Sequence, residues 1–173
     1  PESHPHYMKA RETGRSLAEA GYNVVNVGGP VIMEAANRVA KDAGVKSVGC
    51  NIRLPREQKP KPYFVEFFEF DNLFVRKVML VKLSSAFVVH PGGFGTLDEV
   101  FEAITLIQTE KIEAFPVVVV GREFWNPLHD FIKNTMLREG TINADDLDLF
   151  SIADSPEDVL PLITSTGIQP PLP

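Results

Sequence analysis

The chain has 173 residues, a length that fits one domain with its own hydrophobic core and needs no disulfide or metal to fold. Asp and Glu outnumber Lys and Arg by 23 to 17, a net charge of −6, which argues against a general nucleic-acid-binding protein. One cysteine excludes an internal disulfide, and no apolar run approaches the roughly 20 residues that span a bilayer. We therefore expect a cytoplasmic protein with neither nucleic acid nor membrane as a partner.

Helix-like and strand-like segments alternate along the chain, and Gly21 and Gly44 end the first two expected helices. In chain order we expect a helix over 5–20, a strand over 22–27, a helix over 31–43, a strand over 45–51, a basic loop over 52–62, a strand over 64–70, a helix over 72–83, a strand over 85–90, a helix over 95–110, a strand over 116–120, a helix over 125–138, a strand near 148–152 and a helix near 156–165. This alternation indicates an α/β fold with a doubly wound, mostly parallel sheet and helices on both faces. We expect one domain over residues 1–166 and a proline-rich tail over residues 167–173.

Apolar residues at helical spacing predict which side of each helix is buried. In the helix over 72–83 they are Leu73, Val75, Val78, Met79 and Leu83. In the helix over 95–110 they are Leu97, Val100, Phe101, Ile104 and Ile107. In the helix over 125–138 they are Trp125, Leu128, Phe131, Ile132 and Met136.

A glycine-rich segment, His90 to Glu99 (HPGGFGTLDE), follows an expected strand and opens an expected helix. Its glycines allow backbone N–H groups to approach an anion, and the helix N-terminus adds a favourable dipole. Thr96 can cap the helix or bind a phosphate oxygen. Asp98 and Glu99 are expected in the first helical turn, where the dipole favours acidic residues. The segment is therefore either a phosphate cradle or a plain strand-to-helix turn.

The string P-G-G-x-G-T-x-x-E over residues 91–99 resembles the LOG ("lonely guy") family of cytokinin-activating phosphoribohydrolases, also called lysine decarboxylase-like. Residues 28–30 (GGP), 32–38 (IMEAANR), 74–79 (FVRKVM), 85–89 (SAFVV) and 105–109 (TLIQT) are also similar to this family. The resemblance implies a Rossmann-like nucleotide-binding domain that hydrolyses the N-glycosidic bond of AMP or an N6-modified AMP to a free base and ribose 5-phosphate. It implies a homo-oligomer, a dimer or larger, with no metal and no cofactor.

The resemblance also implies site residues. Glu99 would stabilise an oxocarbenium-like sugar or orient the attacking water; the alternative is a helix N-terminal charge without chemistry. Arg76 would contact substrate and help to position or charge-balance Glu99, because its fork binds carboxylate or phosphate. The residues implied to cradle the 5′-phosphate are Gly92, Gly93, Gly95 and Thr96. Others implied to bind the nucleotide are Gly29, Met33, Glu34 and Lys77, although Met33 can equally be a core residue and Lys77 a solvated one.

Three further features have plainer interpretations. His90, at a strand end, is expected to be packed or solvent-facing rather than to touch a ligand. The basic residues of the loop over 52–62 are expected to be solvated, with anion capture as the alternative. Cys50 is expected to be buried in a strand without chemistry.

The first glycine turn departs from the family, because Val27 and Val31 stand where relatives have glycine. Val27 can simply extend the preceding strand. Val31 is the more serious change, because a β-branched residue resists positive φ and places two methyl groups where backbone would approach a ligand. The strand that opens the family's domain is also missing from this sequence, so we expect either absent upstream residues or an altered member. The leading hypothesis is an active phosphoribohydrolase. The alternatives are a non-catalytic nucleotide- or phosphate-binding protein on the same fold and an oligomer with a vestigial site.

Overall fold

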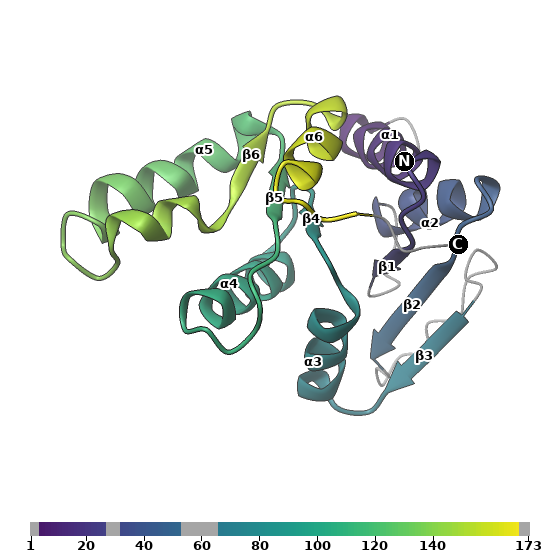
Figure 1. The fold of residues 1–173 in the computed structure, drawn as a ribbon, viewed down its shortest axis with the longest axis horizontal. Helices are drawn as coiled ribbons and strands as arrows, with labels where there is room; N and C mark the ends of the chain where they lie inside the picture. Colours follow the sequence, from purple (N-terminus) through teal and green to yellow (C-terminus); the bar gives the residue numbers. More distant parts are fainter. Residues whose placement is uncertain (1–3, 27–31, 53–65, 170–173) are drawn as a thin grey trace. The chain divides into compact units, whose positions relative to one another are not determined.

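The computed structural model describes residues 4–26, 32–52 and 66–169. The chain divides into two compact units, residues 1–84 with 169–173 and residues 85–168 (Figure 1). Both units combine parallel strands with helices, which confirms the expected α/β class. The six strands of the described residues pair as two sheets of three rather than as one sheet. Within these residues no helix is both long and apolar enough to cross a membrane.

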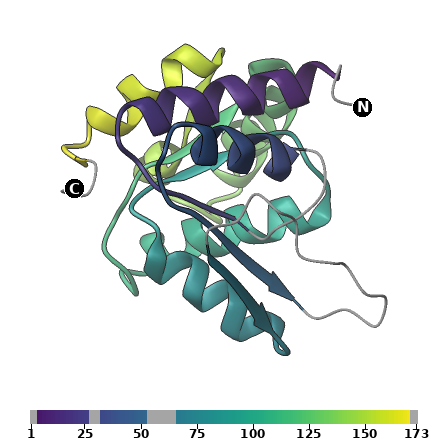
Figure 2. The same ribbon diagram turned by 90° about the vertical axis from the view of Figure 1, so that its right-hand side faces the viewer.

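The first unit contains a parallel sheet in the order β1-β2-β3, formed by β1 (Val24–Asn26), β2 (Ser47–Ile52) and β3 (Glu66–Phe70). Val24 lies opposite Ser47, and Val48 lies opposite Glu66. Its helices are α1 (Pro5–Glu19), α2 (Ile32–Asp42) and α3 (Leu73–Leu83). Helix α1 packs on α2, while α2 and α3 both contact the sheet (Figure 2).

The ends of α1 and α2 are set by glycines in left-handed backbone conformation, as their positions in the sequence predict. Gly21 has φ 91°, and the N–H of Tyr22 donates to the carbonyl of Leu17 at 3.0 Å. This bond closes a Schellman motif, which only a residue without Cβ forms readily. Helix α2 ends in the same way at Gly44, whose φ is 75°.

A buried polar network joins the end of β1, the middle of α2 and the start of β2. The side-chain amides of Asn26 and Asn37 exchange two hydrogen bonds, of 2.7 and 3.1 Å. The Ser47 hydroxyl donates to the same oxygen of Asn37 at 2.9 Å. Asn37 and Ser47 are both buried, so each needs these partners to offset the cost of leaving water. The network therefore fixes where α2 lies between β1 and β2.

The second unit contains a parallel sheet in the order β4-β5-β6, formed by β4 (Phe87–Val89), β5 (Val117–Val120) and β6 (Ser151–Ala153). Phe87 lies opposite Val117, and Val118 lies opposite Ser151. The other elements are α4 (Phe94–Gln108), α5 (Arg122–Phe131), a π-helical turn (Ile132–Met136), two 3₁₀ turns (Ala144–Leu149 and Pro156–Asp158) and α6 (Val159–Thr164). All four valines of β5 are buried, as expected for a strand with neighbours on both edges.

The predicted buried sides of the helices are only partly confirmed. Trp125 and Ile132 are buried, and the Trp125 ring N–H donates to the carbonyl of Val120 at 3.2 Å. Phe131, predicted on the same side, is instead 53% exposed. It lies six residues after Trp125, about 120° away around the helix, whereas Ile132 lies seven residues after Trp125 and returns to the buried side.

Helices α3 and α4 show the same limit of a periodicity argument. In α4 the fully buried residues are Val100 and Ala103, and the rest of the predicted stripe is half-buried. In α3 the ends of the predicted series, Leu73 and Leu83, are exposed. The buried residues of α3 are Leu80 and Val81, so this helix covers the sheet with its C-terminal half.

Replacing Asn37 by alanine should destabilise the protein, because it removes the network and leaves the Ser47 hydroxyl buried without its acceptor. We expect the free energy of unfolding to fall by about 3 kcal/mol in urea denaturation. The control is Asn23→Ala. Asn23 accepts a 3.0 Å hydrogen bond from the backbone of Lys46 in an exposed position, where water can replace it, so about 1 kcal/mol or less is expected. Equal losses for the two variants would contradict the structural role given to the network.

Candidate functional site

The glycine-rich segment lies at the carboxyl end of β4, where the chain enters α4. The N-cap of α4 is Gly93, in extended conformation and without a side-chain capping hydrogen bond. The carbonyl of Gly93 accepts from the N–H groups of Thr96 and Leu97 at 3.0 and 3.1 Å. The N–H groups of the residues before Thr96, at the very start of the helix, point out of the helix along its axis. These amides and the dipole make the start of α4 a place where an anion can bind.

Thr96 does not cap the helix, contrary to one of the two roles that the sequence suggests. Because α4 begins at Phe94, Thr96 is already its third residue. Its side chain lies against the backbone of Gly92 instead. A side-chain carbon added at Gly92 would lie 2.8 Å from the Cβ of Thr96 and closer still to its Oγ1. Glycine at position 92 is therefore required by the side chain of Thr96.

The sequence predicts both Asp98 and Glu99 in the first turn of the helix. In the structure they lie in the second turn of α4. The first turn holds no acidic residue. The dipole effect fades within that turn, so the interpretation of Glu99 as a plain helix N-terminal charge loses its physical basis. Glu99 follows Gly95 by four residues and Thr96 by three, and such residues share one face of a helix. Its half-buried carboxyl group lies on the face that carries the glycine-rich segment.

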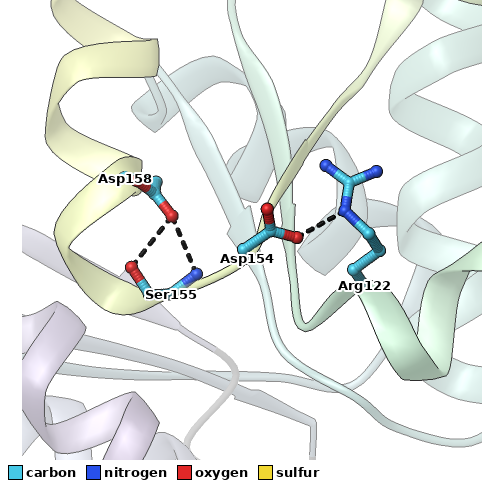
Figure 3. A network of polar contacts seen from close by, with 4 residues as sticks. All are labelled: Arg122, Asp154, Ser155 and Asp158. Carbon is cyan, nitrogen blue, oxygen red and sulfur yellow. Dashed lines mark hydrogen bonds and ion pairs between the residues drawn. The ribbon is translucent and has the colours of Figure 1, made fainter.

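The carboxyl end of β5 lies beside this segment, and that of β6 follows on the other side of β5. A side-chain carbon at Gly121, directly after β5, would lie 3.8 Å from the ring of Pro91, so the two strand ends are neighbours. Arg122 opens α5, and its Nε donates to Asp154, which follows β6 (Figure 3). Both side chains are exposed, and a pair of this kind contributes little stability. It does connect the start of α5 to the end of β6.

A second hydrogen-bonded turn follows Asp154. The backbone N–H and the hydroxyl of Ser155 both donate to Oδ2 of Asp158, at 3.0 and 2.8 Å (Figure 3). This capping box begins the short helical segment that leads into α6.

His90, between β4 and Pro91, is half-buried. The described part of the chain contains no cluster of three or more His, Cys, Asp or Glu residues arranged to hold a metal ion.

Arg76 and Lys77 lie on α3 in the first unit, and both are half-buried. Cys50 is buried in β2, which confirms the expectation that this thiol lies buried in a strand. The charge of Arg76 acts on this thiol. Burial raises the pKa of the Cys50 thiol, and the nearby Arg76 guanidinium partly offsets that rise. Lys77 follows Arg76 by one residue, so the two side chains leave the helix about 100° apart.

The remaining predicted site residues belong to the first glycine turn and α2. Met33 and Glu34 lie in the first turn of α2, and only their backbone is described. Gly29, Val27 and Val31 lie outside the described residues. The same holds for the basic loop predicted over 52–62, except for Ile52, which ends β2. The structure therefore brings together Gly92, Gly93, Gly95, Thr96 and Glu99 within one segment.

Three residues at this edge escaped the sequence analysis, namely Phe94, Arg122 and Asp154. Phe94 is the variable position of the glycine-rich string, so the motif assigned it no role. Asp154 directly follows the strand at 151–153, and Arg122 is the second residue after the strand at 117–120. Carboxyl ends of parallel strands are where ligands bind in such sheets, and this rule would have singled out both residues.

The chain is similar to known proteins over most of its length. Residues 33–163 match the family model described as "Possible lysine decarboxylase". A rice (Oryza sativa subsp. japonica) protein named cytokinin riboside 5′-monophosphate phosphoribohydrolase LOG is 31% identical over 79% of this chain and 57% of its own length. A Mycobacterium tuberculosis protein named cytokinin riboside 5′-monophosphate phosphoribohydrolase is 35% identical over 56% of this chain and 52% of its own. The chain thus spans little more than half the length of these two relatives.

The fold also has solved counterparts. The structure of the molybdenum cofactor binding protein from Rippkaea orientalis superposes with a TM-score of 0.70 and 23% identity, over 97% of this chain and 92% of that one. At this identity the likeness concerns the fold alone. It agrees with the Rossmann-like architecture that the sequence predicts. By its family match and its relatives, the chain belongs to the LOG, or lysine decarboxylase-like, family.

Proposed function

We propose that this protein hydrolyses the N-glycosidic bond of a nucleoside 5′-monophosphate, AMP or an N6-modified AMP, to a free base and ribose 5-phosphate. The observation that carries the proposal is the position of Glu99, on the face of α4 that also holds Gly95 and Thr96. A carboxylate one helical turn from an anion-binding helix start suits a substrate that joins a phosphate to a reactive sugar. The names of the rice and mycobacterial relatives support the same reaction.

The 5′-phosphate would bind at the start of α4. The first amides of the helix donate to its oxygens, and the helix dipole favours its charge. We assign the cradle to Gly92, Gly93, Gly95 and Thr96. Side-chain carbons at Gly93 or Gly95 would meet no atom within 4 Å, so the space beside both residues is open to a ligand.

The chemical step would be the attack of water on the C1′ carbon of the ribose. The bond from C1′ to the base nitrogen breaks, and its electron pair leaves with the base, which takes up a proton. Positive charge develops on the sugar while the bond to the base is breaking and the bond to water is not yet complete. The Glu99 carboxylate stabilises this charge. Glu99 also accepts a proton from the attacking water and then releases it, to the departing base directly or through solvent, which restores its carboxylate. One water molecule is consumed, and a base and ribose 5-phosphate are released.

The other assignments rest on the family resemblance. We propose Arg76 as the second catalytic residue, through contact with the substrate. Lys77, Met33, Glu34 and Gly29 are proposed to bind the nucleotide. We further propose that the protein acts as a homo-oligomer, a dimer or larger.

A second candidate function is non-catalytic binding of a nucleotide or another phosphate-bearing ligand. Val31 favours it, because it replaces a glycine of the family in the first glycine turn. The fold also occurs in the molybdenum cofactor binding protein from Rippkaea orientalis. This alternative uses the same start of α4 and requires no turnover.

Replacing Glu99 by glutamine should remove turnover and keep binding. The amide preserves the shape of the side chain but neither carries negative charge nor accepts a proton, so kcat for release of adenine from AMP should fall by about 10²- to 10⁴-fold. Affinity for AMP, measured by calorimetry, should stay close to that of the wild type. The matched control is Asp98→Asn, an acidic neighbour that leaves the helix about 100° away and should retain activity. A similar loss in both variants would contradict a specific role for Glu99.

The first glycine turn separates the two candidate functions. If Val31 only blocks catalysis, wild-type protein should bind AMP without releasing adenine or ribose 5-phosphate, and Val31→Gly should restore release. If the enzyme is active, wild-type protein releases both products, from AMP or from N6-isopentenyl-AMP. Product release is measured by chromatography. Release by the wild type would eliminate the binding-only alternative.

Gly92→Ala should damage the phosphate cradle. The added methyl group overlaps the side chain of Thr96, so the turn must shift, at a cost of about 1–3 kcal/mol in stability. Affinity for ribose 5-phosphate, measured by calorimetry, should fall with it. Gly95→Ala is the control for stability, since the methyl group meets open space and alanine favours a helix by about 1 kcal/mol. A Gly92→Ala protein as stable as the wild type would show that Thr96 does not hold this turn.

A further inference from the structure

Phe94 is the most exposed of the large apolar residues in the described part of the chain. Its exposed fraction is 92%, against 68% for the next, Phe74. It is the first residue of α4 and stands between Gly93 and Gly95. Single exposed apolar residues are common on proteins, but this one lies inside the segment that we propose to hold the substrate phosphate.

The fold does not need the ring of Phe94. With so little of its surface buried, the side chain contributes almost nothing to the core of the second unit. Its backbone supplies the helix start, and any residue suited to a first helical turn would do the same. The glycines on either side have open space where side chains would stand. The ring itself is almost fully exposed, so the fold leaves it free to contact a ligand.

We propose that Phe94 packs against the nucleobase of the bound nucleotide and so selects nucleotides over sugar phosphates; this inference rests on the proposed function. The amide of Phe94 is among those at the start of α4, so its ring is attached at the phosphate position. From there the nucleotide continues through ribose to the base. Of these three parts only the base has an apolar flat face, and a phenyl ring gains most by stacking on such a face.

The test compares two ligands that share the phosphate and the sugar but differ in the base. Calorimetry of AMP and of ribose 5-phosphate is carried out with wild-type protein, Phe94→Ala and Phe94→Trp. We expect Phe94→Ala to weaken AMP binding about tenfold, within the range found for stacking of a base on an aromatic ring. Its affinity for ribose 5-phosphate should not change. Phe94→Trp, which keeps an aromatic ring at this position, should bind AMP about as tightly as the wild type does.

A matched control removes another exposed phenyl ring. Phe131 is 53% exposed at the end of α5, and Phe131→Ala should bind both ligands as the wild type does. Unchanged AMP affinity in Phe94→Ala, or equal losses for AMP and ribose 5-phosphate, would overturn the inference. A smaller particle mass of Phe94→Ala in light scattering would also overturn it, because a second copy of the chain would then be what covers the ring.

The two proposals fail in different ways. If wild-type protein binds AMP with help from Phe94 but releases no adenine, the hydrolase proposal fails and the role of Phe94 in base binding stands. If adenine is released at equal kcat/KM by wild type and Phe94→Ala, the hydrolase proposal stands and the role of Phe94 is wrong. If wild-type protein binds neither AMP nor ribose 5-phosphate, both are wrong.

Discussion

Parallel pairing of β4, β5 and β6 is the constraint on which the candidate site depends. Because the three strands run in one direction, their carboxyl ends lie at one edge of the sheet. Three chain segments consequently meet there: the glycine-rich segment, the start of α5 and the turn at Asp154. The packing of Gly121 beside Pro91 and the bond from Arg122 to Asp154 connect these segments in turn. A change in β5, the central strand, would therefore disturb all three.

The first unit adds a buried hydrogen-bond network to its apolar core. Asn37 reaches both the end of β1 and the start of β2. Amides that exchange two hydrogen bonds restrict relative position more narrowly than apolar contacts do, because their geometry is directional.

Much of this architecture could be predicted from the sequence, and the failures have physical causes. The Schellman glycines at 21 and 44 and the buried valines of β5 have strong local signals. The start of α4 has none, since its N-cap, Gly93, has no side chain to serve as a capping residue. Asn37 gives no sign of burial, because its partners lie 11 residues before it and 10 residues after it. The pairing of the strands into two sheets is likewise set by contacts distant in sequence.

The three glycines of the glycine-rich segment are glycine for different reasons. At Gly92 a side chain would collide with Thr96, so the protein's own packing requires glycine. At Gly93 and Gly95 nothing in the described structure opposes a side chain. Gly95 even lies within α4, where glycine costs about 1 kcal/mol relative to alanine. A sequence that accepts such a cost without a structural need does so where function demands it. The proposed approach of a ligand to the backbone at Gly93 and Gly95 would be a demand of that kind.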